Sequence, residues 1–152
     1  MTRTRLFSRS ASTAELAGLA LLFLSLCACG DSEPEEGSDA CAQVLEESCQ
    51  PQYSPEYDLI FNRTLVSSCG VAGGSCHATE GAQAGLVFAE ADASYDYLTG
   101  AGALVVPGDP ACSTIVKRLE APELARAMPP GSRLSEGERC AIEAWIRNGA
   151  ER

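Results

Sequence analysis

The chain has 152 residues, of which 45% are hydrophobic, and a formal net charge of −10 at pH 7. This length suits one compact domain with a modest core. The excess of acidic residues argues against nucleic acid and anionic membrane surfaces as partners, and it favours a basic protein partner.

Residues 1–28 are predicted to be a lipoprotein signal peptide. Three arginines, Arg3, Arg5 and Arg9, precede the apolar run of residues 16–26. That run is too short to cross a membrane as a stable helix, as is typical of export signals. An ordinary cleaved signal peptide or a retained anchor helix are the alternatives.

The run ends in Leu26-Cys27-Ala28-Cys29-Gly30, which resembles a bacterial lipobox. In such signals the cysteine that follows a small residue is lipidated and becomes the new first residue. Cys29 follows alanine, whereas Cys27 follows bulky leucine, so we predict lipidation at Cys29. The protein is therefore expected to be exported and anchored by lipid to the bacterial cell envelope, at the outer membrane on its periplasmic or surface side.

Residues 29–54 are expected to form a lipidated acidic linker and a short N-terminal segment. Residues 31–39 are acidic, rich in turn formers and free of apolar side chains, so they cannot contribute to a core and predict a flexible tether. Removal of the signal would leave 8 basic and 20 acidic residues, which makes the charge more negative still.

Six cysteines follow Cys29, and an even number in an exported domain indicates disulfides. Cys41 and Cys49 would lie about 12 Å apart on a continuous helix, beyond the roughly 7 Å limit for a bridge. They can pair only if the helix suggested by residues 42–47 ends before Cys49. Cys112 and Cys140 lie near the beginnings of two expected helices. We favour the pairs Cys41–Cys49 and Cys112–Cys140, although six cysteines allow 15 connectivities.

Scattered cysteines and a single histidine argue against a structural zinc site, which needs four closely spaced ligands.

Beyond the linker, apolar residues from Tyr57 to Leu65 recur at intervals of three and four, which predicts an amphipathic helix over residues 55–68. This helix leads into Cys69, and six residues later come Cys76 and His77, the only histidine in the chain. Two cysteines followed directly by histidine are how c-type haem is held, with the thiols bonded to the porphyrin and the imidazole bound to the iron.

The spacing of this motif is unusual, because two residues normally separate the cysteines and here there are six. Along a continuous helix Cys69 and Cys76 would be about 10 Å apart. The glycines between them would allow the segment to loop out and bring the thiols together. The same loop would also permit a disulfide, which would leave His77 as an ordinary polar residue. A third alternative is haem attached through Cys76 alone.

The remaining pattern is also helical. Residues 93–98 predict a short helix that ends at Gly100, and a turn at residues 106–110 leads into a helix that ends near Leu119. Residues 128–130, Met-Pro-Pro, are expected to be extended. Ser135 and Glu138 form a capping box, which opens a final helix with apolar residues on one face. The fold class is therefore mostly α, with long connections rich in glycine and proline.

The order of five segments resembles a cytochrome c-like domain found in predicted lipoproteins of planctomycetes and deltaproteobacteria. The segments are Cys76-His77, Val106-Pro-Gly-Asp-Pro110 with Ser113, Met128-Pro-Pro130, Leu134-Ser-Glu-Gly-Glu138 and Ile142–Ala150. The resemblance implies a small cytochrome c-like helical domain over residues 55–150, stapled by disulfides. It also implies that Cys69 and Cys76 attach haem c, that His77 and Met128 are the iron ligands, and that Trp145 lies near the haem.

A histidine and a methionine on haem iron leave no open position for a substrate, which favours an electron carrier over an enzyme. The sequence contains neither a Gly-x-Ser-x-Gly elbow nor a phosphate-binding loop. We therefore expect a lipid-anchored, non-enzymatic electron-transfer protein. The alternative is a haem-free, disulfide-stapled structural or binding lipoprotein on a cytochrome-like scaffold.

Overall fold

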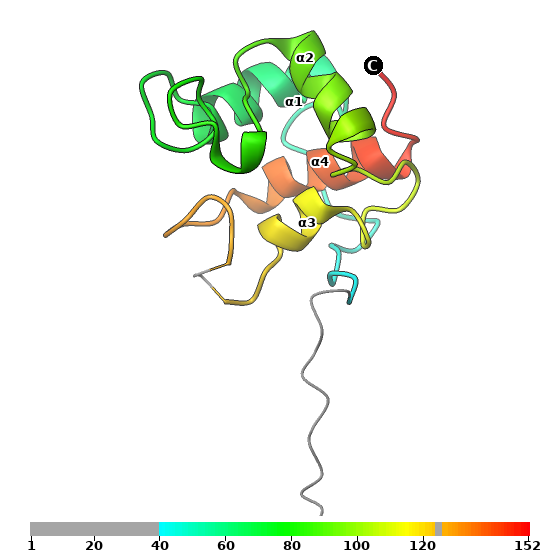
Figure 1. Ribbon diagram of the computed structural model, residues 1–152. Helices are drawn as coiled ribbons and strands as arrows, with labels where there is room; N and C mark the ends of the chain where they lie inside the picture. The colour runs from blue at the N-terminus through cyan, green and yellow to red at the C-terminus, as the bar shows by residue number, and fades with distance from the viewer. Residues whose placement is uncertain (1–39, 124–125) are drawn as a thin grey trace, which may run out of the picture. The chain divides into compact units, whose positions relative to one another are not determined.

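The computed structural model describes residues 40–123 and 126–152. The predictions for the signal peptide, for Cys29 and for the acidic tether up to residue 39 lie outside these residues. The described part is helical and has no β-strand, which confirms the mostly α class (Figure 1). None of its helices combines the length and the hydropathy needed to cross a membrane. In chain order, the elements are α1 (Tyr57–Ile60), η1 (Phe61–Cys69), η2 (Gln83–Gly85), α2 (Ala91–Asp96), η3 (Tyr97–Ala101), α3 (Thr114–Leu119) and α4 (Glu136–Arg147).

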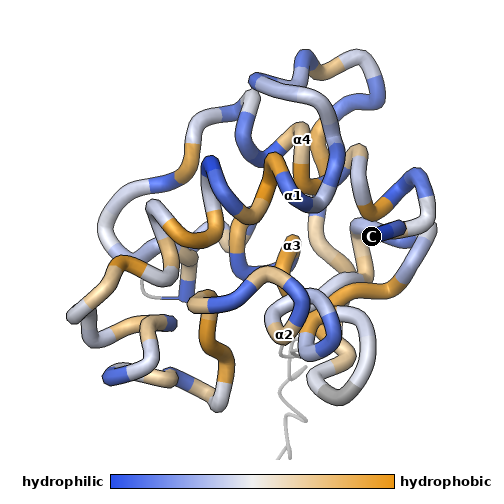
Figure 2. Tube along the Cα trace, turned by 90° about the horizontal axis from the view of Figure 1, so that it is seen from above, coloured by the Kyte–Doolittle hydropathy of each residue, from blue (hydrophilic) through white to orange (hydrophobic). Residues whose placement is uncertain are grey.

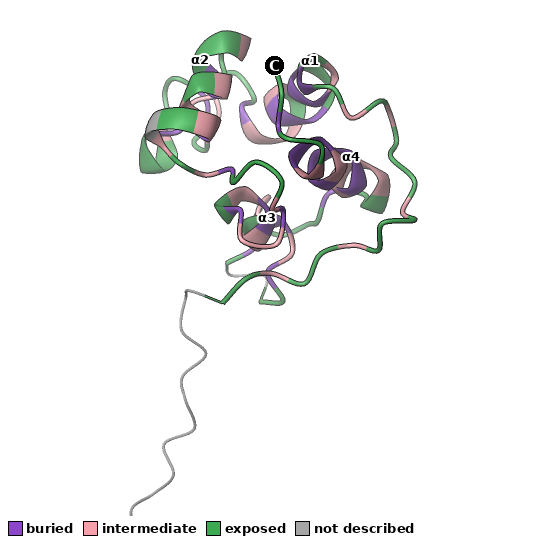
Figure 3. Ribbon diagram, turned by 90° about the vertical axis from the view of Figure 1, so that its right-hand side faces the viewer, coloured by how far each residue is buried: buried purple, intermediate pink, exposed green. Residues whose placement is uncertain are grey.

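Helix α4 begins at the predicted capping box. The Ser135 hydroxyl accepts a hydrogen bond from the Glu138 backbone N–H at 3.2 Å, and the Glu138 carboxylate accepts one from the Ser135 N–H at 2.9 Å. These reciprocal bonds satisfy two N–H groups that would otherwise have no partner at the helix start. The residues on the predicted apolar face, Ile142, Trp145 and Ile146, are each 3% exposed or less. Figure 3 shows α4 as a largely buried helix between α1 and α3.

The core forms where α1 and η1 pack against α4. The predicted helix over residues 55–68 is confirmed as α1 and the π-helical segment η1, which bury Tyr57, Ile60, Phe61 and Leu65. In Figure 2 hydrophobic stretches of α1, α3 and α4 gather near the centre of the trace. The predicted short helix near residues 93–98 corresponds to α2 and η3, and α3 follows the predicted turn.

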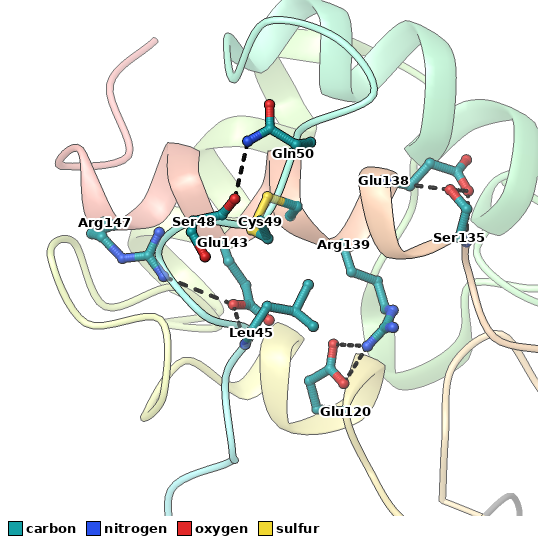
Figure 4. The surroundings of a disulfide bond; sticks show 11 residues. Leu45, Ser48, Cys49, Gln50, Glu120, Ser135, Glu138, Arg139, Glu143 and Arg147 are labelled. Atoms are coloured by element: carbon teal, nitrogen blue, oxygen red, sulfur yellow. Dashed lines mark hydrogen bonds and ion pairs between the residues drawn. A yellow bond between two sulfur atoms is a disulfide. The ribbon is translucent and has the colours of Figure 1, made fainter.

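Residues 40–52 form an irregular segment, which we call the N-terminal strap. The helix suggested over residues 42–47 does not form; the strap has only a turn, closed by a hydrogen bond from the Cys49 N–H to the Glu46 carbonyl at 2.9 Å. Its other backbone groups bind distant parts of the chain. The Ala42 N–H donates to the Ala111 carbonyl at 2.8 Å, and the Leu45 N–H donates to Glu143 on α4 at 2.9 Å (Figure 4).

The strap determines the disulfides. All four favoured cysteines form bridges, but the predicted pairing is wrong: the bonds are Cys41–Cys112 and Cys49–Cys140. An extended chain advances about 3.3 Å per residue, so the two strap cysteines lie too far apart to pair with each other. Each one instead meets a different element, the loop before α3 or the first half of α4.

Candidate functional site

The chain between Cys69 and His77 loops out and returns to its starting point. Cys69 is the last residue of η1, and its carbonyl accepts a hydrogen bond from the His77 N–H at 3.1 Å. A turn from Val71 to Gly74, with Gly73 at a φ of 74°, reverses the chain. Positive φ is readily adopted by glycine because it has no Cβ. The segment therefore loops out instead of continuing the helix. The separation of about 10 Å that a continuous helix would impose on Cys69 and Cys76 does not apply.

Residues further along the chain hold this loop closed. The Phe88 N–H donates to the His77 carbonyl at 2.7 Å, and the Gln83 N–H donates to the Cys76 carbonyl at 3.0 Å. Two glycines allow the close approach. A Cβ on Gly70 would lie 2.6 Å from the Phe88 carbonyl oxygen, and one on Gly81 would lie 2.4 Å from the Ser75 carbonyl carbon. Residues 69–88 are therefore a tightly folded unit, which we call the histidine loop.

Both cysteines of the loop are free thiols, so the disulfide between Cys69 and Cys76 that the sequence left open is not formed. Cys69 is half-buried against the core, whereas Cys76 is exposed. Burial raises the pKa of the Cys69 thiol to about 11, and the neighbouring Cys76 and Glu138 add to the shift. A thiol with such a pKa is protonated at neutral pH, which is unfavourable for a catalytic nucleophile.

The His77 ring is oriented by the loop itself. Its Nδ1 lies 3.2 Å from the Leu86 carbonyl oxygen, and its edge faces the Phe88 ring at a centroid distance of 5.7 Å. A backbone carbonyl can only accept, so Nδ1 carries the proton and the lone pair is on Nε2. Within the described residues Nε2 has no hydrogen-bond partner. A carbonyl on one ring nitrogen and a free lone pair on the other is the arrangement common to metal-binding histidines.

Met128 lies on a separate segment that follows α3. Its N–H donates to the Arg118 carbonyl at 2.9 Å, and its side chain is half-buried beside the buried Ala127. The structure therefore brings Cys69, Cys76 and His77 together through one loop, and it positions Met128 independently through α3. In Figure 1 the histidine loop, in green, and the segment around Met128, in orange, both project on the left-hand side of the molecule.

One feature of this region was not predicted. A polar cluster lies beside Cys69: the Tyr53 and Thr64 hydroxyls share a short hydrogen bond, and Thr64 donates to Glu138 at 3.3 Å. Burial also raises the pKa of Tyr53. No local pattern links these residues, because they come from the segment that directly follows the strap, from η1 and from α4.

Trp145, which the resemblance implies lies near the haem, is buried on α4. Its ring packs on Tyr57 at a centroid distance of 5.4 Å, and its indole N–H donates to the Glu151 carbonyl at 2.7 Å. A hollow of about 390 Å³ lies at this end of α4, lined by residues of α1 and of the C-terminal tail. Within residues 40–123 and 126–152, no group of three or more histidine, cysteine or acidic side chains is arranged to hold a metal ion. A haem site would need only one or two protein ligands to its iron.

Comparison with known proteins agrees with the resemblance seen in the sequence. No curated protein and no solved structure matches the chain significantly. Residues 74–132 match the family model described as planctomycete cytochrome C. The matched stretch contains Cys76, His77 and Met128 and begins after Cys69. Residues 74–132 are thus similar to planctomycete cytochrome C, which is consistent with a cytochrome c-like domain of the planctomycete type.

Proposed function

We propose that this protein is a lipid-anchored cytochrome c-like electron-transfer protein whose haem is bound through His77 and Met128. The closed loop from Cys69 to His77 is the observation that carries the proposal. It brings the backbone of Cys69, whose thiol is free, against the backbone of His77, although six residues separate the two cysteines. A motif that the spacing alone would disqualify thereby becomes compatible with haem attachment.

The residues of the histidine loop fit a haem group. The Leu86 carbonyl holds the ring of His77 so that Nε2 is available as an axial ligand. The Phe88 ring provides an apolar neighbour, and both thiols are available for thioether bonds. When bound, haem iron would supply one-electron oxidation and reduction. The chain would contribute the ligands, their orientation and the burial around them.

Several properties favour an electron carrier over an enzyme. Histidine and methionine together would fill both axial positions, so no site on the iron remains for a substrate. The net charge of −10 would attract a basic redox partner and accelerate encounter at low salt. Lipidation at Cys29 would keep the protein at the envelope; its replacement, Cys29→Ala, should abolish labelling by a radioactive fatty acid.

Haem attachment is tested by expressing the full chain with cytochrome c maturation machinery. The wild-type protein should show a Soret band and a haem stain that survives denaturation. His77→Ala should lose the low-spin spectrum, whereas Ser75→Ala, an exposed neighbour, should not. Cys69→Ala distinguishes attachment by two thiols from attachment through Cys76 alone: only if both thiols are bonded does the variant keep an unreacted vinyl group, which shifts the pyridine haemochrome absorption band to longer wavelength than in the wild type. A wild-type protein with the mass of the polypeptide alone and no Soret band would contradict the proposal.

The role of Met128 is tested separately. Met128→Ala should lower the reduction potential and allow imidazole to bind the ferric iron, because a methionine ligand raises the potential and occupies the sixth position. Ser132→Ala, on the same segment, is the matched control. An unchanged potential and unchanged imidazole binding in Met128→Ala would remove this residue from the site.

Two observations favour the alternative of a haem-free scaffold. The family match begins after Cys69, and the six-residue gap departs from the usual spacing of a haem motif. Under that alternative the protein is a structural or binding lipoprotein stabilised by two disulfides. It would purify colourless even when the maturation machinery is present.

A further inference from the structure

Glu120, at the end of α3, lies between two arginines that come from different parts of the chain. Its carboxylate binds the Arg139 guanidinium on α4 through a short ion pair, which Figure 4 shows, and it lies 3.4 Å from the guanidinium of Arg133. The Glu120 side chain is 9% exposed and that of Arg139 is 13% exposed. This ion pair is therefore largely buried. Buried charges are screened less by solvent and salt than charges on the surface.

Arg133 also binds the backbone at the end of α3. One of its Nη atoms donates to the Ala121 carbonyl, and the other lies 3.5 Å from the Leu119 carbonyl. The last carbonyls of a helix have no partner within the helix, so such contacts satisfy groups that would otherwise need water. Arg133 thereby joins the chain that follows Met128 to the helix that precedes it.

The Met128 segment, residues 126–133, is thus attached to α3 at two points. Near its beginning the Met128 N–H donates to the Arg118 carbonyl at 2.9 Å, and at its end Arg133 binds residues 119–121. Glu120 links this second attachment to α4 through Arg139. None of these residues belongs to the histidine loop or lines the hollow beside Trp145.

We propose that Glu120 is a positioning residue for Met128: by holding Arg133 and Arg139 together, it keeps the Met128 segment closed on α3. The consequence for ligand exchange at the iron rests on the proposed function, whereas the closure of the segment does not. Without the Glu120 charge, two guanidinium groups face each other, and the buried Nε of Arg139 already has no hydrogen-bond partner among the described residues. Arg133 then leaves the end of α3, and the segment that carries Met128 separates from α3 more often.

The first test needs no haem. Hydrogen–deuterium exchange is measured on the full chain made without maturation machinery, at the amides of Ala127 and Met128. Glu120→Gln, which keeps the size of the side chain and removes its charge, should accelerate exchange about tenfold. Arg133→Gln should accelerate exchange at the same amides. It disturbs the fold less than Glu120→Gln, because the Arg133 side chain is 34% exposed. The double variant should be little faster than either single variant, since both remove one interaction.

The second test uses the haem-loaded protein and titrates ferric iron with imidazole. An open segment leaves the sixth position free, so the apparent affinity rises in proportion to the open fraction. Glu120→Gln should bind imidazole about tenfold more tightly than the wild type. Ile146→Val, a core substitution on α4 outside this cluster, controls for a general loss of stability and should change neither the exchange nor the affinity.

The proposal is overturned if exchange at Ala127 and Met128 is no faster in Glu120→Gln and Arg133→Gln than in Ile146→Val. It is also overturned if Met128→Ala opens the iron to imidazole while Glu120→Gln does not. A colourless wild-type protein would refute the proposed function instead, and the exchange result would then still decide whether Glu120 holds the segment.

Discussion

Replacing both Cys49 and Cys140 by alanine should destabilise the protein by about 4 kcal/mol while leaving it folded. A disulfide stabilises mainly by restricting the unfolded chain, and the effect grows with the length of the loop that it closes. The Cys49–Cys140 bond joins residues 91 apart in sequence. The loop that the Cys49–Cys140 bond closes in the unfolded chain is shorter than this separation, because the other bridge, Cys41–Cys112, already links the two halves of the chain.

With that second bridge intact, the shortest path between Cys49 and Cys140 runs back to Cys41, across the bond and forward from Cys112. This path contains roughly 36 residues, for which the chain-entropy relation gives about 3.8 kcal/mol at 25 °C. Removing both bridges should cost about 8 kcal/mol, because the last bridge to be removed closes a loop of 71 or 91 residues. Domains of this size have a total stability of about 5–15 kcal/mol, so only the double removal should threaten folding.

The assay is urea unfolding of the oxidised protein and of the alanine variants, followed by circular dichroism. The midpoint should fall with the number of bridges removed, and the thermal midpoint of each single-bridge variant should fall by about 15 °C. Digestion of the oxidised protein after glutamate residues would separate the two strap cysteines, so mass spectrometry can identify the partner of each.

A loss below about 1 kcal/mol in the single-bridge variant would refute the loop-entropy reasoning. A peptide map that links Cys41 to Cys49 would refute the arrangement of the strap itself. As a control, Gln43→Ala, an exposed change on the strap, should leave the unfolding midpoint unaltered.

Three further predictions concern the loop and α4. Gly81→Ala should destabilise the protein by about 1–3 kcal/mol, because its Cβ would meet backbone atoms that cannot move away. Gly73→Ala meets no neighbouring atom and should cost only about 1 kcal/mol of backbone strain. Equal thermal midpoints for the two variants would count against the close approach at Gly81. Burial raises the pKa of Glu143, so its neutral form is favoured in the folded protein and its contribution to stability is lost as pH rises from about 4 through the raised value. Glu143→Gln should therefore flatten the dependence of unfolding free energy on pH in that range, and an unchanged pH profile would contradict this. Ser135→Ala should lower stability by about 1 kcal/mol through loss of the cap, measured by urea unfolding against Ser132→Ala.

Local patterns predicted the helices that depend on residues close in sequence. The capping box of Ser135 and Glu138 involves groups three residues apart, and the apolar positions of α1 and η1 repeat within one or two turns. Such interactions are specified by the segment that makes them, so reading the segment is enough. The helix expected over residues 42–47 failed because that segment gains its hydrogen bonds from Ala111 and Glu143 instead.

The candidate site divides in the same way. The sequence by itself identified Cys69, Cys76, His77 and Met128 as the haem-binding candidates, because their types and order are informative without coordinates. Only the tertiary structure decided that the histidine loop closes, since the contact between Gly70 and Phe88 joins residues 18 apart. It alone decided the disulfide pairing and the arginine cluster around Glu120, because both depend on which distant segments fold against each other. Sequence periodicity describes one segment at a time, whereas these contacts exist only after the segments have packed.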